Sequence, residues 1–216
     1  MACAAMLAGV LAGCSESTEK GDATSASKAS SKASASASAA GGVESGGSVG
    51  AAGSACELPV GFDIAEKWKA EAVDNAPSGT GQAEDELADL VLTQGPVSLV
   101  CEIDAKPAGN IGFLRAWTGK PGGADARTVL EEYVADEPGA KVSKERFSTF
   151  KAGDLAGVEV KYLTTVEFLD ETKENSALAV VTPDGPVVLH LGGLDSDEHQ
   201  GMLPAFELAK KTLHTV

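Results

Sequence analysis

Hydrophobic and polar residues alternate with a period of two in the second half of the chain, a pattern typical of strands with one buried face. The clearest case is residues 157–168, where nearly every second residue is apolar. Three other segments show similar alternation or short apolar runs: 97–105, 110–117 and 146–152. Pro183-Asp184-Gly185 separates two further apolar runs and predicts a hairpin turn. The pattern therefore predicts a mainly antiparallel sheet.

Two segments show apolar residues at helical spacing. In residues 126–134 they recur every three or four positions, and Asp125 is a candidate N-cap. A second apolar stripe, made by Met202, Phe206, Ala209 and Leu213, lies near the C-terminus in a segment that also contains Pro204. Because proline is tolerated only near the first turn, we expect this helix to begin at about Met202 or Leu203. The expected fold class is α+β, a mainly antiparallel sheet flanked by helices.

The N-terminus predicts a lipoprotein signal segment over residues 1–13. This stretch is uncharged and too short for the roughly 20 apolar residues of a membrane-spanning helix, but it suits the apolar part of a secretory signal. Leu11-Ala12-Gly13-Cys14 resembles the bacterial lipobox, in which the cysteine receives a diacylglyceryl group. The alternative is a buried cysteine in an N-terminal helix. Since a signal needs a basic first part and the first basic residue is Lys20, we expect the natural start upstream of Met1.

Residues 14–55 are predicted to be the lipidated Cys14 followed by a disordered tether of Ser, Ala and Gly. Such a segment buries too little apolar surface to offset its ordering entropy. Two or more acyl chains on the cysteine anchor a protein stably. We therefore expect a domain over 56–216, held by lipid at the extracytoplasmic face of the cell membrane.

The domain is strongly acidic. Residues 56–216 contain 28 Asp and Glu against 14 Lys and Arg, and so carry 14 of the chain's 15 net negative charges. This balance argues against nucleic acid as a partner, because binding to phosphates needs basic groups. The simplest interpretation is solubility outside the cell, and the alternative is a site for a cationic ligand or a metal.

Two cysteines remain in the domain, Cys56 and Cys101. In an exported protein we expect them to form a disulfide. Two unpaired thiols are the alternative. A redox-active pair is less well supported, because nothing like Cys-x-x-Cys occurs.

The sequence predicts no catalytic residue, metal or cofactor. It contains neither a nucleophile motif nor a glycine-rich phosphate loop with its lysine. His190 lies within a predicted strand, where histidines are mostly core or edge residues. The acidic cluster 195–200 could hold a divalent metal together with His199, but capping of the last helix by Ser196 or Asp197 is the simpler interpretation.

Three residues are candidates for binding a partner or ligand: Trp68, Arg115 and Trp117. Aromatic and Arg side chains supply large contact areas at interfaces. The alternative is that both tryptophans fill the core beneath the helices.

The order of the elements and the stretch CEIDAKPAGNIGFLRAW (101–117) resemble the LpqN-type actinobacterial lipoproteins, whose domains are similar to PsbP and form an α/β/α sandwich. The resemblance implies a membrane-anchored extracytoplasmic lipoprotein with a non-enzymatic domain that binds an envelope protein or assists assembly. The first alternative is a carrier of a small apolar ligand or lipid. The second is an extracellular hydrolase, which needs a nucleophile and base that the sequence does not show.

Overall fold

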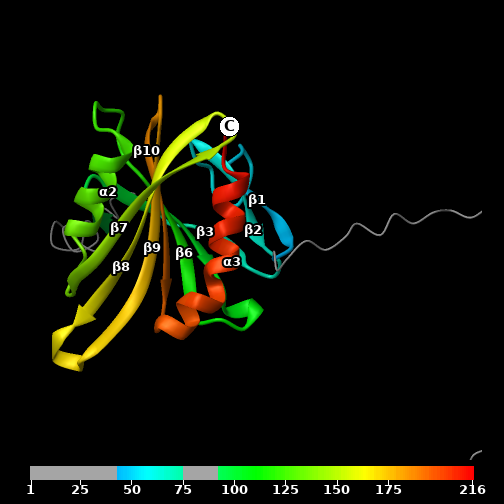
Figure 1. Ribbon diagram of the computed structural model, residues 1–216. Coiled ribbons are helices and arrows are strands. Elements are labelled where there is room, and N and C mark those ends of the chain that lie inside the picture. The colour runs from blue at the N-terminus through cyan, green and yellow to red at the C-terminus, as the bar shows by residue number, and fades with distance from the viewer. Residues whose placement is uncertain (1–42, 75–91) are drawn as a thin grey trace, which may run out of the picture. The chain divides into compact units, whose positions relative to one another are not determined.

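An eight-stranded antiparallel sheet forms the centre of the domain (Figure 1). The computed structural model describes residues 43–74 and 92–216. Across the sheet the strands follow the order β3 (Lys69–Ala72), β5 (Val97–Asp104), β6 (Gly112–Thr118), β10 (Gly185–Gly193), β9 (Glu171–Thr182), β8 (Leu155–Val166) and β7 (Lys141–Ala152), with β4 (Thr93–Gln94) beside β5.

The strands predicted from the period of two are present, and several of their bounds differ. The β9–β10 hairpin forms as expected, with Thr182 paired to Gly185. Strand β7 begins at Lys141, earlier than predicted. Phe168, expected on the buried face of β8, lies instead in the short 3-10 helix η2 (Glu167–Leu169) and is 85% exposed. The strand ends there because Asp170 takes a left-handed conformation that closes the turn into β9.

Two helices cover opposite faces of the sheet (Figure 1). The apolar side of α2 (Ala126–Ala135) packs with Trp117, Tyr162 and Val188 in one core. The apolar side of α3 (Ser196–Thr212) packs with Leu114, Leu189 and other residues on the opposite side of the same strands. This arrangement confirms the predicted α/β/α sandwich, and Asp125 caps α2 by accepting the Thr128 backbone N–H at 2.8 Å.

Helix α3 begins six residues before the predicted start at Met202. Its N-cap is Asp195, which accepts the Glu198 backbone N–H at 2.9 Å, and not the expected Ser196 or Asp197. Pro204 lies inside the helix. The proline removes the donor for the Gln200 carbonyl, and because Gln200 is exposed, water can replace that donor.

A second, three-stranded sheet contains β1 (Ser45–Val49), β2 (Val60–Ala65) and β11 (His214–Thr215). Helix α3 packs on β2. The domain therefore begins before Cys56, and part of the predicted tether is folded. Val49 is buried, and pairing with β2 satisfies the backbone of this Ser- and Gly-rich strand.

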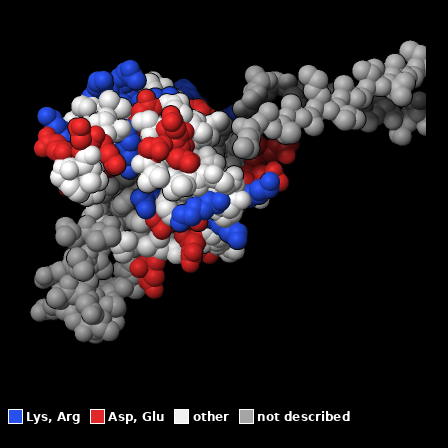
Figure 2. All heavy atoms as spheres, turned by 90° about the horizontal axis from the view of Figure 1, so that it is seen from below, with Lys and Arg blue, Asp and Glu red and all other residues white. Residues whose placement is uncertain are grey.

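Cys56 and Cys101 form the predicted disulfide, with an S–S distance of 1.98 Å. Both residues are buried, and the bond links the segment between β1 and β2 to β5 of the large sheet. In the described part of the chain, the structure contains no helix long and apolar enough to cross a membrane. Acidic and basic side chains are interspersed on the face shown in Figure 2, so the net negative charge does not form a uniform surface there.

Candidate functional site

The structure does not bring the three predicted binding residues together. Trp68 is 7% exposed and packs in the core beneath α3, whereas Trp117 is 5% exposed and packs beneath α2. Arg115 is partly exposed and donates from Nε to Glu102 Oε1 at 2.7 Å. The tryptophans therefore fill the core, the alternative interpretation of the sequence. Cys14, the predicted lipidation site, lies outside the described residues.

An aromatic cluster lies between α2 and the sheet. The Tyr133 ring centroid lies 5.5 Å from that of Trp117 and 5.9 Å from that of His190, and the His190 ring stacks on Tyr162. Burial, with a smaller effect of Arg115, lowers the pKa of His190 to about 3. His190 is therefore a neutral ring of the core, as expected for a histidine within a strand.

Polar groups line one side of this cluster. The Glu137 carboxylate accepts hydrogen bonds from Tyr162 Oη at 3.0 Å and from Gln94 Nε2 at 3.2 Å, and burial raises the pKa of Glu137. Tyr133 Oη and His190 Nε2 have no hydrogen-bond partner. Buried donors of this kind commonly bind an ordered water.

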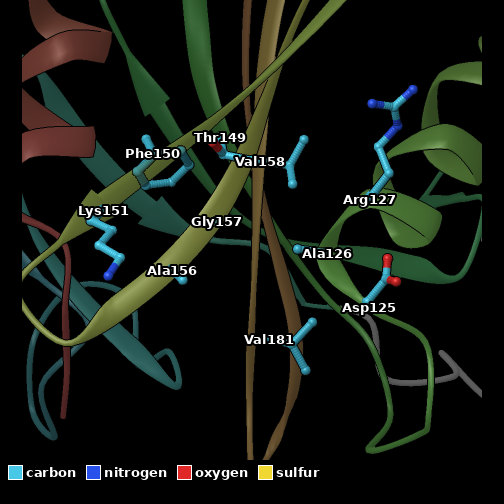
Figure 3. A pocket seen from close by; sticks show the side chains of 10 residues that line it. All are labelled: Asp125, Ala126, Arg127, Thr149, Phe150, Lys151, Ala156, Gly157, Val158 and Val181. Atoms are coloured by element: carbon cyan, nitrogen blue, oxygen red, sulfur yellow. The ribbon is translucent and has the colours of Figure 1, made fainter.

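A groove of about 760 Å³ lies between the start of α2 and strands β7, β8 and β9 (Figure 3). Val158 and Val181 supply much of its apolar wall. Phe150 and Gly157 also line the groove, but the Phe150 ring lies against Gly157 on the α3 side of the sheet and packs with that core. The groove also has charged residues in its wall: Asp125, Arg127 and Lys151.

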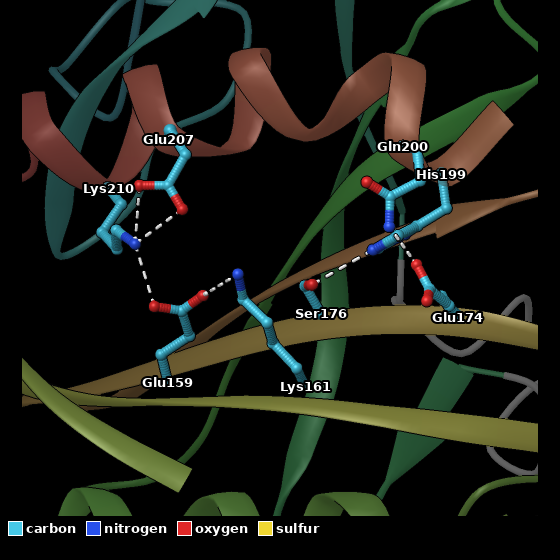
Figure 4. A network of polar contacts seen from close by, with 8 residues as sticks. All are labelled: Glu159, Lys161, Glu174, Ser176, His199, Gln200, Glu207 and Lys210. Carbon is cyan, nitrogen blue, oxygen red and sulfur yellow. Dashed lines mark hydrogen bonds and ion pairs between the residues drawn. The ribbon is translucent and has the colours of Figure 1, made fainter. Parts of the chain in front are cut away.

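On the face of the sheet opposite to α2, a polar network joins α3 to strands β8 and β9 (Figure 4). The Glu159 carboxylate is buried and accepts a hydrogen bond from Lys210 Nζ at 2.9 Å. Lys210 also pairs with Glu207 at 2.7 Å. At the other end of the helix, Gln200 donates to the Glu174 carboxylate.

The same face places Ser176 Oγ 3.1 Å from His199 Nε2. Sequence reasoning missed this pair because the two residues lie on different elements, β9 and α3. Ser176 is fully buried, and among the described residues no carboxylate accepts a hydrogen bond from His199 Nδ1 to orient the ring as a triad acid would. Burial also lowers the pKa of His199, so the imidazole is a weak base. The pair is built as a packing contact between helix and sheet.

Beside this pair lies a pocket of about 410 Å³ between β7, β8, β9 and α3. Three basic residues line it: Lys144, Arg146 and Lys161. The one acidic residue in its wall is Glu174, whose carboxylate accepts from the Gln200 amide. The pocket is therefore basic, although the domain as a whole is acidic.

The acidic cluster 195–200 caps helix α3 and ties its first turn to the segment before β6. Asp195 is its N-cap, and Glu198 accepts the Ile111 backbone N–H at 2.9 Å. Within residues 43–74 and 92–216, the structure contains no group of three or more His, Cys, Asp or Glu side chains that could hold a metal ion.

Comparison with known proteins places the chain in a family. Residues 24–213 match the family described as uncharacterised lipoprotein. The chain belongs to this lipoprotein family. The match spans most of the folded domain and part of the predicted tether, and it favours a location in the cell envelope. Among curated proteins, none matches the chain.

The fold is similar to that of a solved structure, the cyanobacterial PsbP (CyanoP) of Synechocystis. The TM-score is 0.50 and the identity 10%, with 73% of this chain and 87% of CyanoP covered. At this identity the likeness concerns the fold alone. It agrees with the PsbP-like sandwich that the sequence predicts.

Proposed function

We propose that this lipoprotein is anchored through acyl chains on Cys14 at the extracytoplasmic face of the cell membrane, and that its domain binds an envelope protein without catalysing a reaction. Membership of the lipoprotein family supports the anchor. The resemblance to LpqN-type lipoproteins supports a role in binding or assembly.

The groove in Figure 3 carries the proposal of partner binding. It joins an apolar wall that contains Val158 and Val181 to charged side chains at Asp125, Arg127 and Lys151. Protein interfaces have this anatomy, with an apolar centre that excludes water and a polar rim. Val181 remains 37% exposed at the groove, so a partner that covers it would remove apolar surface from water.

Site-specific photo-crosslinking in native cells tests this proposal. A photoreactive residue at Val181 should yield one discrete protein adduct, and the identified partner, once purified, should bind the wild-type chain more tightly than the V181E variant. A photoreactive residue at Leu194, which is 62% exposed and outside the groove, is the matched control. Identical adducts at both positions, or none at Val181, would contradict the proposal.

A carrier function is the second candidate, because about 760 Å³ lies within the usual range of ligand sites, roughly 300–1,000 Å³. Native mass spectrometry of the detergent-extracted protein separates the two functions. A small lipid that is retained by the wild type and lost from V181E would favour the carrier.

The anchor has a separate test. Intact mass spectrometry of the membrane-extracted chain should show a diacylglyceryl adduct on a mature protein that begins at Cys14. The C14S variant should lose both the adduct and the membrane association. An unmodified Cys14 in the wild type would overturn the proposed location.

A further inference from the structure

Two positive charges face each other across neighbouring strands of the basic pocket. Arg146 on β7 is paired with Lys161 on β8, and Lys161 is paired in turn with Ser176 on β9. Both basic residues line the pocket. Like charges directly opposite each other in an antiparallel sheet are destabilising. Because both side chains are exposed, water and salt screen the repulsion, but the pair adds no stability to the sheet.

A β-bulge creates this like-charge pair. The register of β7 against β8 shifts between Ser143, which pairs with Leu163, and Arg146, which pairs with Lys161. In an unshifted register, Glu145 would lie opposite Lys161 and the two would attract. The extra residue in β7 thus replaces an attractive pair by a repulsive one, and bulges are frequent next to functional sites.

Within the bulge, Lys144 has a φ of 57°, in the left-handed region. A residue with a Cβ is strained there by roughly 1–2 kcal/mol. Lys144 also lines the pocket. Strain held beside a cavity, where glycine would relieve it, points to a role for the lysine side chain.

The positive charge of the pocket is only partly neutralised. In the part of the chain that the structure describes, neither Lys144 nor Arg146 forms an ion pair or a side-chain hydrogen bond. Lys161 lies 3.8 Å from the Glu159 carboxylate, but Lys210 holds the same carboxylate at 2.9 Å. In a domain with twice as many acidic as basic residues, three cations at one pocket are an exception.

We propose that this pocket binds a phosphate group carried on a small molecule or a lipid headgroup. Arg146 offers a planar fork of donors, and the two lysines add ammonium groups, which together suit an anion with several oxygens and more than one negative charge. A single carboxylate needs fewer cations. At about 410 Å³ the pocket has room for more than the phosphate itself. The groove proposed above for partner binding shares no lining residue with this pocket, so each proposal can be tested independently of the other.

Isothermal titration of the full-length chain in neutral detergent tests the proposal, with inorganic phosphate and glycerol 3-phosphate as probes. Wild type should bind glycerol 3-phosphate, and R146Q and K161M should each bind it about tenfold more weakly, the loss expected for one charged hydrogen bond. The matched control K120M removes an exposed lysine outside the pocket and should bind as the wild type does.

Mixed micelles of the neutral detergent with phosphatidylglycerol separate the two sources of phosphate. Binding of glycerol 3-phosphate that R146Q weakens supports a soluble phosphate ester. Binding of the micelles alone, again weakened by R146Q, supports a lipid headgroup. The proposal is overturned if the wild type binds neither glycerol 3-phosphate nor the phosphatidylglycerol micelles. It is also overturned if R146Q and K161M bind these probes as tightly as K120M does.

Discussion

Lys210 on α3 donates a hydrogen bond at 2.9 Å to the buried carboxylate of Glu159 on β8, and this ion pair ties the C-terminal helix to the sheet. Burial by itself lowers the pKa of Lys210, but the hydrogen bonds to Glu207 and Glu159 outweigh it and the net shift is upward. The lysine is therefore charged at neutral pH. Its contribution to stability is present below the ordinary pKa of 10.5 and is lost as pH rises through the raised value.

We expect K210M to lower the free energy of unfolding by about 2–3 kcal/mol, because it leaves the buried Glu159 carboxylate without its closest cation. E159Q should cost less, since Lys210 keeps its pair with Glu207. The double variant E159Q/K210M should lose less than the sum of the two single changes. Guanidinium denaturation of all four proteins measures this coupling.

E207Q is the matched control for this pair, because the Glu207 side chain is 48% exposed. Its loss should be below about 0.5 kcal/mol, as for other exposed ion pairs. Strict additivity of E159Q and K210M would show that the bond across β8 and α3 contributes nothing.

The disulfide is expected to stabilise the domain through the chain it closes. Cys56 and Cys101 are 45 residues apart. On the chain-entropy model, a loop of this length is worth up to about 4 kcal/mol. The C56S/C101S variant should lose about 2–4 kcal/mol in denaturant unfolding. Adding a reductant should destabilise the wild type and leave the variant unchanged, and equal stability of the two proteins without reductant would refute the role.

His190 should make the domain less stable as the pH falls. The pKa of His190 is about 3 in the fold and 6.5 ordinarily, so between these values the unfolded chain binds a proton that the folded chain does not. As the pH is lowered through this window, the free energy of unfolding therefore decreases, by up to about 1.4 kcal/mol per pH unit.

The H190F variant keeps an aromatic ring in the core and removes this titration. Between about pH 6.5 and about pH 4.5, its free energy of unfolding should fall by about 2 kcal/mol less than that of the wild type. Denaturant unfolding at the two pH values measures the difference. The same fall in both proteins would mean that His190 is protonated in the fold.

The central sheet could be predicted from the sequence because burial of one strand face imposes an alternation that the residues retain. Residues 97–104 and 155–166 show this directly. Strand β1 could not be predicted, because its SGGSV sequence has a single apolar side chain to bury and is ordered by pairing with β2. Pro204 led us to predict a start of α3 that is too late. In the structure, the packing of Met202 and His199 in the core outweighs this local effect of proline.

The candidate sites were less accessible from the sequence, since they depend on register. Trp117 and Arg115 were singled out for their chemistry and lie on the same face of β6, yet α2 covers the first, while the second stays partly exposed and pairs with Glu102. The basic pocket depends on a bulge that shifts Arg146 opposite Lys161. No pattern in the residues of β7 alone reveals which strand residue they will face.

Lys144 permits a test that separates strain from charge. Both K144G and K144A remove the ammonium group, but only glycine takes a φ of 57° without strain. We expect K144G to be more stable than K144A by about 1 kcal/mol in denaturant unfolding. Both variants should bind glycerol 3-phosphate about tenfold more weakly than the wild type, since each removes one charged contact. A K144G protein that is more stable than the wild type and still binds as tightly would show that the lysine serves neither the strand nor the pocket.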